Sequence, residues 1–294
     1  MKKKLKYILI ILSILIICTV LIILDSYINI DISHYEIKSN KINQKYNNYK
    51  IMLLTDLHNR DITKKLLRIV NEENPNLIVM SGDMINEKVD GFDNFFNLCE
   101  KIKDKTIYYV FGNHEENMSN EKQTEFITKL KEKTNVILLN NDKIELDDNF
   151  TIYGFSHQVK YYLASTKEKI DSRYIEEKIG KIDKNKFNLL ISHDPLLYNL
   201  YNEYGFDVVL SGHMHGGIIN IPFIGGLLSP DFTFLRSLLN SFLPYILVPV
   251  YTSSIITAFG YKSFIFLICL SIDCCFVLIL VYPYIICYSI LFIK

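Results

Sequence analysis

The chain has 294 residues, which is enough for one large domain or two small ones. Its 32 basic and 32 acidic residues cancel, so composition gives no net field that would favour nucleic acid as a partner. Its six cysteines supply neither a disulfide framework nor a paired-thiol zinc pattern, because only Cys99 lies in the charge-rich region from Lys38 to Lys186.

The first 25 residues predict a membrane anchor. Four lysines within residues 2–6 precede an apolar stretch from Tyr7 to Leu24, which is long enough to cross a bilayer at about 1.5 Å per residue. A cleavable signal peptide and a lipobox ending at Cys18 are the alternatives, but no small-x-small cleavage site follows the stretch and bulky Ile17 precedes the cysteine. We expect an uncleaved signal anchor over 1–25 in the cell membrane, with the following domain outside the cytoplasm.

Residues 26–49 are polar and rich in asparagine and lysine, and we expect a stalk that leads into a first edge strand near Tyr35. From Lys50 onwards, short apolar runs alternate with segments whose apolar residues recur at helical spacing. The expected strands lie at 51–54, 77–80, 107–111, 136–139, 143–146, 150–155, 187–191 and 208–210, and the expected helices lie near 66–70, 92–103, 120–133 and after Pro195. This alternation predicts an α/β domain with helices packed over a sheet. The strands at 143–146 and 150–155 are expected to form a hairpin, which suggests a second, mixed sheet.

Five short polar clusters follow directly on these apolar runs. They are Asp56-Leu57-His58, Gly82-Asp83, Gly112-Asn113-His114-Glu115, Ser192-His193-Asp194 and Gly212-His213-Met214-His215. Because ligands gather beyond the carboxyl ends of strands in α/β folds, clusters far apart in sequence are expected to converge at one edge. Together they offer carboxylate, amide and imidazole groups but no thiolate, a donor set that suits two divalent cations sharing a carboxylate. Such a pair of cations equips a site to hydrolyse phosphate esters.

Each cluster alone has a simpler explanation. An aspartate after a strand is often a helix N-cap, and Gly-Asp and Gly-Asn pairs are common in turns. A shared site is favoured because five of the seven histidines fall inside the clusters. His34 and His157 fall outside them, and we expect His157 to be a surface residue.

In this order the clusters resemble the signature of the calcineurin-like metallophosphoesterases, which reads D-x-H, G-D, G-N-H-[DE], an isolated histidine and G-H-x-H. The resemblance runs from about Lys50 to Asp231, and the sequences His215-Gly216-Gly217 and 222–226 are similar to a bacterial, membrane-anchored branch of that family. It implies an α/β domain over 50–231 in which helices flank a two-sheet β-sandwich. It also implies a metal-dependent hydrolase that acts on phosphomonoesters or, as a phosphodiesterase, on phosphodiesters.

The resemblance also implies roles for individual residues. One cation would be bound by Asp56, His58 and His215, and the other by Asn113, His193 and His213. Asp83 would bridge the two cations together with a hydroxide, and manganese, iron, zinc and magnesium all suit this site. His114 would be the catalytic histidine that protonates the leaving alkoxide or stabilises the developing charge. Glu115 and Asp194 are candidates to orient histidine ligands by hydrogen bonding.

The resemblance ends after Asp231. Residues 232–294 form an apolar tail whose only charged residues are Arg236, Lys262, Asp273 and Lys294. Two explanations are open: a pair of membrane spans, roughly 238–261 and 264–292, or a frameshifted terminus that leaves the sheet without its closing strands.

The expected location suggests a phosphate-ester substrate that belongs to a lipid or another component of the cell envelope. Two other classes of function are open. One is a metal-free scaffold of the same fold that binds proteins, and the other is a membrane-embedded component of transport or assembly.

Overall fold

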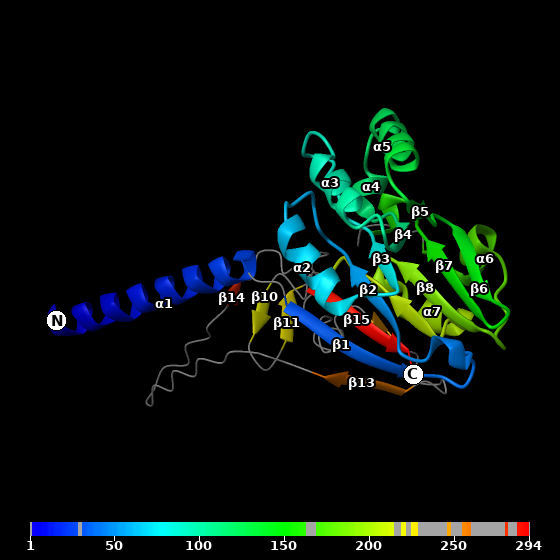
Figure 1. Cartoon of the computed structure of the whole chain (residues 1–294). Helices are drawn as coiled ribbons and strands as arrows, with labels where there is room; N and C mark the ends of the chain where they lie inside the picture. Colours follow the sequence, from blue (N-terminus) through cyan, green and yellow to red (C-terminus); the bar gives the residue numbers. More distant parts are fainter. Residues whose placement is uncertain are drawn as a thin grey trace. The chain divides into compact units, whose positions relative to one another are not determined.

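The computed structural model divides the chain into two compact units (Figure 1). The described residues are 2–28, 31–162 and 169–214, with short strands at 219–221, 225–228, 246–247, 255–259, 280–281 and 287–293. The larger unit comprises 32–213, 245–261 and 287–294, and it contains the two sheets that the sequence predicts.

The first sheet of the larger unit has seven strands in the order β13-β1-β15-β2-β3-β4-β5. Their bounds are Ile255–Phe259 for β13, Asp31–Lys38 for β1, Cys287–Ile293 for β15, Tyr49–Leu54 for β2, Leu77–Ser81 for β3, Thr106–Val110 for β4 and Val136–Leu138 for β5. Strands β2 to β5 run parallel, whereas β15 pairs antiparallel with β2. Strand β3 is buried throughout, which explains the unbroken apolar run from Leu77 to Met80.

The second sheet has five strands in the order β12-β9-β8-β7-β6. Their bounds are Ile246–Leu247 for β12, Val208–Leu210 for β9, Phe187–Ser192 for β8, Phe150–Phe155 for β7 and Asp142–Asp147 for β6. Strands β7, β8 and β9 run parallel, and β6 forms the predicted antiparallel hairpin with β7. The mixed second sheet is therefore confirmed.

A single hydrophobic core joins the inner faces of the two sheets. Ile51 and Val79 from the first sheet share it with Ile152, Leu189 and Val208 from the second, and all five are fully buried. Successive side chains of a strand point to opposite faces, so the intervening residues face outward toward the helices. Burial of this kind contributes about 25 cal/mol per Å² of apolar surface and holds the two sheets together.

Helices cover the outer face of each sheet (Figure 1). The first sheet carries α2 (Thr63–Glu73), α3 (Asp93–Lys101) and α5 (Asn120–Lys133), and the second carries α6 (Ser172–Ile179) and α7 (Tyr198–Tyr204). Rings of Phe95 on α3 and Phe126 on α5 lie 5.6 and 6.3 Å from Tyr109 of β4, measured between centroids. The short α4 (Asn113–Glu116) and the 3-10 turns η1 (Gln44–Tyr46), η2 (Val159–Tyr162) and η3 (Pro195–Leu197) complete this unit.

The smaller unit contains α1 (Lys2–Ile28) and a three-stranded sheet of β10 (Ile219–Ile221), β11 (Gly225–Leu228) and β14 (Leu280–Val281). The expected anchor segment is therefore helical. Within the part of the chain that the structure describes, however, no helix meets the combined length and hydropathy needed to cross a membrane. The transmembrane assignment of residues 1–25 is not confirmed.

Two expectations about the ends of the domain need correction. Strand β1 lies between β13 and β15 rather than at the edge of its sheet, and Tyr35 and Ile37 are buried in the core. Strand β15 lies in the segment read as a membrane span over 264–292, yet it pairs with β2 and buries Leu291 and Ile293. Most other residues of 232–294 lie outside the described part, so neither explanation of that tail is tested there.

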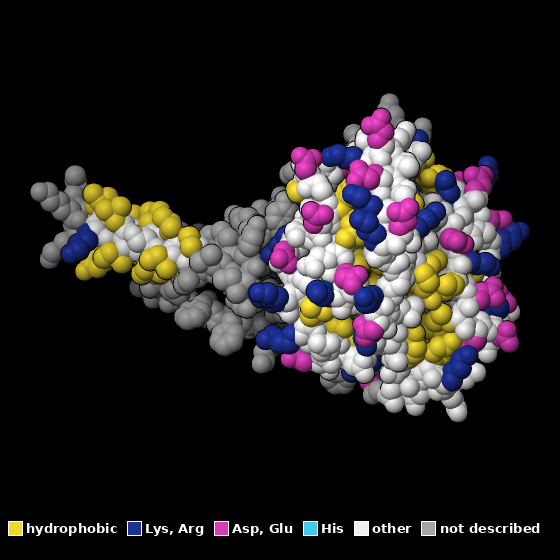
Figure 2. Space-filling view, turned by 45° about the horizontal axis from the view of Figure 1, so that its top comes forward, with side chains coloured by type: hydrophobic (Ala, Val, Ile, Leu, Met, Phe, Trp, Pro, Cys, Tyr) yellow, Lys and Arg dark blue, Asp and Glu magenta, His cyan; other side chains and the backbone are white. Residues whose placement is uncertain are grey.

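On the face shown in Figure 2, basic side chains are interspersed with acidic ones rather than gathered into a patch of one sign. This distribution agrees with the equal numbers of basic and acidic residues in the sequence.

Candidate metal centre

Loops that follow strands of both sheets carry the predicted site residues. They are Asp56 and His58 after β2, Asp83 after β3, Asn113 and His114 after β4, His193 after β8 and His213 after β9. These positions are the carboxyl ends of parallel strands, where α/β folds gather ligands. His215 lies outside the described residues.

Two groups of potential metal ligands share Asp83. Ligand atoms of His58, Asp83 and His114 all lie within 4.8 Å of one another, and so do those of Asp83, His193 and His213. Asp83 itself is 1% exposed. A carboxylate common to two groups of ligands is suited to bridging two cations.

Among the described residues, Asp56 belongs to neither of these two groups of ligands. Its carboxylate accepts the backbone N–H of His213, at 3.1 Å to Oδ1 and 3.2 Å to Oδ2. Its Oδ1 lies 3.9 Å from Nε2 of His193. Asp56 thus contacts the His193 and His213 group, whereas the family resemblance assigns it to the same cation as His58.

The ligand loops turn sharply at the ligands themselves. Asp56, His58, Asp83 and His213 have φ angles of 56°, 48°, 52° and 70°. The left-handed region is unfavourable for most side chains, and aspartate, asparagine and histidine are among the residues that occupy it most often. Backbone hydrogen bonds hold the first two loops together, since the N–H of His58 donates to the carbonyl of Asp83 at 2.9 Å.

Two glycines give the loops room to approach one another. Gly82 has a φ angle of 89°, and a Cβ atom there would lie 2.6 Å from Nδ1 of His193. A Cβ atom at Gly112 would overlap the side chain of Asp83. Glycine is therefore required in the G-D and G-N-H motifs by the space around the ligands as well as by the turn.

Glu115 ties the loop after β3 to the loop after β4. Its Oε2 accepts the backbone N–H of Asp83 at 2.9 Å and that of Gly112 at 2.8 Å. Its Oε1 accepts the N–H of Ile85 at 3.1 Å and the hydroxyl of Tyr109 at 2.7 Å. Burial and the nearby charge of Asp83 raise the pKa of Glu115. Glu115 therefore positions the backbone of the loops after β3 and β4, whereas the sequence suggested that it orients a histidine ligand.

Asp83 and His193 stabilise each other's charge. Burial opposes ionisation of Asp83, but the imidazoles of His193 and His114 outweigh it and hold the pKa of Asp83 well below its usual range. Burial likewise opposes protonation of His193, but Asp83 raises the pKa of His193 to about 10. Nδ1 of His193 donates to the carbonyl of Ser81 at 2.7 Å, which directs Nε2 to within 3.0 Å of Oδ2 of Asp83.

His213 is held in its neutral form. Burial, aided by the charge of His193, lowers the pKa of His213 to about 4. Its ring centroid lies 5.0 Å from that of Tyr162 and 5.2 Å from that of His193. A neutral imidazole presents a lone pair to a cation. Tyr162 belongs to η2, and no pattern in the sequence identifies it as part of the site.

His157 is buried, not a surface residue as expected. Its Nε2 hydrogen-bonds to Oδ2 of Asp194 at 3.2 Å, and its ring centroid lies 4.3 Å from that of Tyr162. Burial opposes ionisation of Asp194, but His157 outweighs it and lowers the pKa of Asp194. Asp194 therefore pairs with a histidine outside the predicted ligands. The position of His157 directly after β7 was the available signal, because the ligand clusters also follow strands.

His114 lies between Asp83 and Glu87. Its backbone N–H donates to Oδ1 of Asp83 at 2.9 Å, and its Nε2 lies 3.8 Å from Oδ2 of the same carboxylate. Its Nδ1 hydrogen-bonds to Oε2 of Glu87, and Oε1 of Glu87 accepts from Asn117 at 3.1 Å. Glu87 thereby fixes the orientation of the His114 ring. Sequence reasoning missed Glu87, because it lies in an irregular loop without a recognisable pattern.

The residues present fit a divalent cation. Oδ1 of Asn113 is buried and makes no hydrogen bond within the described part of the chain. Buried polar atoms normally have a hydrogen-bond partner, so this oxygen points to a ligand that would use it. The oxygen and nitrogen donors gathered around Asp83 are those that manganese, iron, zinc and magnesium accept.

The profile of the calcineurin-like phosphoesterase family matches residues 49–217, which is more than half of the chain. The chain belongs to this family. The match covers β2 to β9, the strands whose loops carry the candidate metal centre. The family is metal-dependent, and its members act as phosphoester hydrolases.

Curated relatives support the same class. The chain is 27% identical over 177 residues to an uncharacterized metallophosphoesterase of Helicobacter pylori, a match that covers 58% of this chain and 45% of the relative. It is 28% identical over 181 residues to one of Campylobacter jejuni, covering 60% and 46%. It is 24% identical to the phosphodiesterase YaeI of Escherichia coli over 195 residues, covering 62% and 66%. The chain spans about half the length of the first two relatives.

Proposed function

We propose that the protein hydrolyses phosphate esters with two divalent cations that share Asp83. The observation that supports this best is that Asp83 belongs to both groups of potential ligands. We assign His58 and His215 to one cation, Asn113, His193 and His213 to the other, and Asp56 to a position beside the second group. When bound, the cations would activate a water molecule and stabilise the charge on the phosphoryl oxygens.

The chain's own residues prepare the site for this chemistry. Asp83 is kept ionised by its neighbours, and His213 is kept neutral, so both are in the state that a cation requires. His114 is the proposed general acid, because its Nε2 lies beside Asp83 while Nδ1 is held by Glu87. Glu87 holds the ring so that Nε2 is directed toward Asp83, and a proton on Nε2 would pass from there to the leaving alkoxide.

Hydrolysis by the full-length protein tests the proposal. Wild type and Asp83→Asn should be compared on p-nitrophenyl phosphate and bis(p-nitrophenyl) phosphate with each of the four metals, and bound metal should be measured by mass spectrometry. We expect Asp83→Asn to lose more than about 100-fold in activity and to bind less metal. Mutation of a residue that only hydrogen-bonds to a metal ligand already lowers metal affinity or activity about 10–100-fold. Asp90→Asn is the matched control, because Asp90 is exposed in the loop that follows Asp83. Equal rates for wild type and Asp83→Asn would reject the bridging role.

We also propose that the protein works at the cell membrane, on the outer side, on a phosphate ester of the envelope. This proposal rests on the lysines and apolar residues before residue 25 and on exposed apolar side chains of α1, among them Leu5, Tyr7 and Leu9. Figure 2 shows apolar side chains along this helix. Cell fractionation followed by protease treatment of intact spheroplasts tests it. Recovery of the protein in the soluble fraction would reject it.

A further inference from the structure

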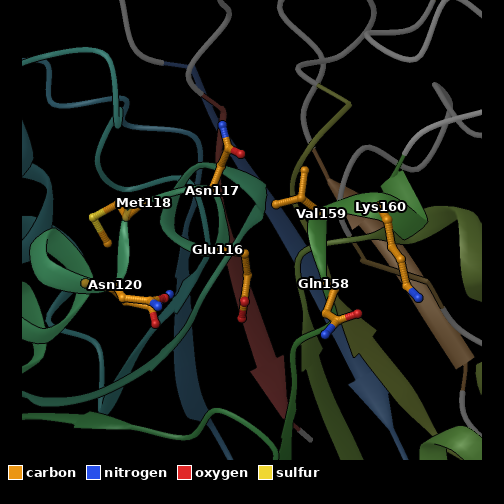
Figure 3. A pocket seen from close by; sticks show the side chains of 8 residues that line it. Glu116, Asn117, Met118, Asn120, Gln158, Val159 and Lys160 are labelled. Atoms are coloured by element: carbon orange, nitrogen blue, oxygen red, sulfur yellow. The ribbon is translucent and has the colours of Figure 1, made fainter.

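A polar pocket is lined by residues that follow His114 in the sequence, and its described lining contains none of the candidate metal ligands. Its volume is about 460 Å³, within the range of small-molecule sites. Figure 3 shows Glu116 and Asn117 between Asn120 on one side and Gln158, Val159 and Lys160 on the other.

The pocket and the candidate metal centre are built on the same two short elements. His114 and Glu116 both belong to α4, so the element that presents the proposed general acid also lines the pocket. Lys160 and Tyr162 both belong to η2, and Tyr162 packs against His213. The two sites are therefore neighbours.

The carboxylate of Glu87 connects the pocket directly to the proposed general acid. One of its oxygens hydrogen-bonds to Nδ1 of His114, and the other accepts from Asn117 of the pocket at 3.1 Å. The contact with His114 is at Nδ1, whereas the leaving oxygen would lie at Nε2 on the other edge of the ring, so Glu87 fixes the ring relative to the pocket. Because α4 carries both His114 and the pocket residue Glu116, the pocket corresponds to the leaving-group side of the proposed reaction.

The chemistry of the lining selects for one kind of alcohol. Four amides line the pocket, from Asn117, Asn120, Gln123 and Gln158, and each amide side chain offers both donors and an acceptor. Hydroxyl groups likewise donate and accept, so a polyhydroxy compound can match this lining. The described lining contains no aromatic ring on which a nucleobase could stack and only two apolar side chains, Met118 and Val159, which is too few to cover an acyl chain.

Several lining side chains are already held in place. Oγ of Ser156 donates to Glu116 at 2.5 Å, and the amide of Gln123 donates to the backbone carbonyl of Glu115 at 3.2 Å. Groups that are fixed before binding lose less conformational freedom when a ligand arrives. Glu116 and Gln123 therefore offer fixed groups to a ligand, whereas Asn120 and Gln158 are exposed at the rim.

We infer that this pocket binds the leaving alcohol of the substrate and that this alcohol is a sugar or a similar polyol. The inference rests on the proposed hydrolase function and specifies its substrate class. The alcohol bound in this pocket needs no apolar group.

The test compares two esters with six-membered rings that differ in the ring hydroxyl groups and in the ring oxygen. Glucose 6-phosphate carries the ring hydroxyls, and cyclohexylmethyl phosphate has a ring of the same size without them. With the full-length protein and Mn²⁺, we expect kcat/KM for the glucose ester to exceed that for the cyclohexyl ester by at least about tenfold. This ratio corresponds to the net free energy of roughly one or two hydrogen bonds. Adenosine monophosphate serves as the aromatic competitor.

Variants locate the preference in the pocket. Asn120→Leu combined with Gln158→Leu replaces two amides by apolar side chains of similar size, and we expect it to remove most of the preference. The matched control combines Gln44→Leu with Asn202→Leu, in η1 and α7, and should keep the preference.

Each other outcome has a distinct meaning. Equal kcat/KM for the two ring esters, a preference for adenosine monophosphate, or a preference that survives in the pocket variant would overturn the pocket assignment and leave the hydrolase proposal standing. Hydrolysis of no ester with any metal would overturn both.

Discussion

The two sheets contribute to the candidate metal centre in different ways. The loops of the first sheet supply the carboxylates and the amide, namely Asp56, Asp83 and Asn113, and they are tied to one another by backbone hydrogen bonds and by Glu115. The second sheet supplies the buried imidazoles of His193 and His213, which are fixed by contacts with the first sheet. The site therefore depends on how the sheets dock as much as on either sheet alone.

The largest effect is expected where the loops of the first sheet are joined. Glu115→Gln replaces a buried carboxylate that accepts from three backbone N–H groups and one hydroxyl. Because the amide NH₂ cannot accept, we expect a loss of about 2–4 kcal/mol in the free energy of unfolding. Metal affinity should also fall about 10–100-fold, since Asp83 loses its support.

Urea unfolding and metal titration measure both effects. Glu121→Gln on the exposed first turn of α5 is the control and should leave both quantities unchanged. Stability of Glu115→Gln equal to that of the control would show that the two loops hold their shape without this carboxylate.

A smaller effect concerns the link between the sheets at Asp83 and His193. Because the pKa of His193 is about 10 without a cation, binding at neutral pH must displace its proton, whereas His213, with a pKa of about 4, has none to lose. Metal affinity should therefore rise by about tenfold per pH unit between about pH 6 and 9. In the metal-free protein, the stabilisation from the raised pKa is complete below 6.5 and is lost as the pH rises through about 10.

Calorimetric titration in two buffers of different ionisation enthalpy counts the released protons. We expect about one proton for wild type and for the control His34→Gln, and none for His193→Asn if that variant still binds. Binding by wild type without proton release would contradict the assignment of His193 as a charged partner of Asp83.

The smallest effect is expected within the second sheet. Tyr162→Leu removes the ring that packs against His213 and His157. Aromatic pairs of this kind are worth about 0.5–1.5 kcal/mol, so metal affinity should fall about 2- to 10-fold. Tyr161→Leu, in the same turn, is the control. An affinity equal to that of the control would mean that packing by Tyr162 does not position His213.

The comparison between the sheets also separates what the sequence can predict from what it cannot. Asp83 and His193 follow apolar strands, and the topology of parallel sheets brings such positions to one edge. Glu87, Tyr162 and His157 act through contacts between irregular loops, which no periodicity in the sequence encodes. The pairing of Asp194 with His157 likewise depends on how two loops pack.

The strands at the ends of the domain were difficult for a related reason. A strand buried on both faces is a continuous apolar run, and periodicity alone does not distinguish such a run from a helix. One of the two explanations of the apolar tail therefore places residues 287–292 in a membrane span, whereas they belong to β15. The core strands of 50–210 were easier to assign, because polar turns and helical segments separate them.

The position of β15 has a consequence for how the protein folds. It is the direct neighbour of β2 in the sheet, although residues 55–286 separate the two strands along the chain. Pairings of such high contact order form slowly, because a large loss of chain entropy precedes any gain in contacts. During synthesis, β2 must therefore remain without this neighbour until residue 293 has emerged from the ribosome, and in that interval its open backbone is exposed to aggregation.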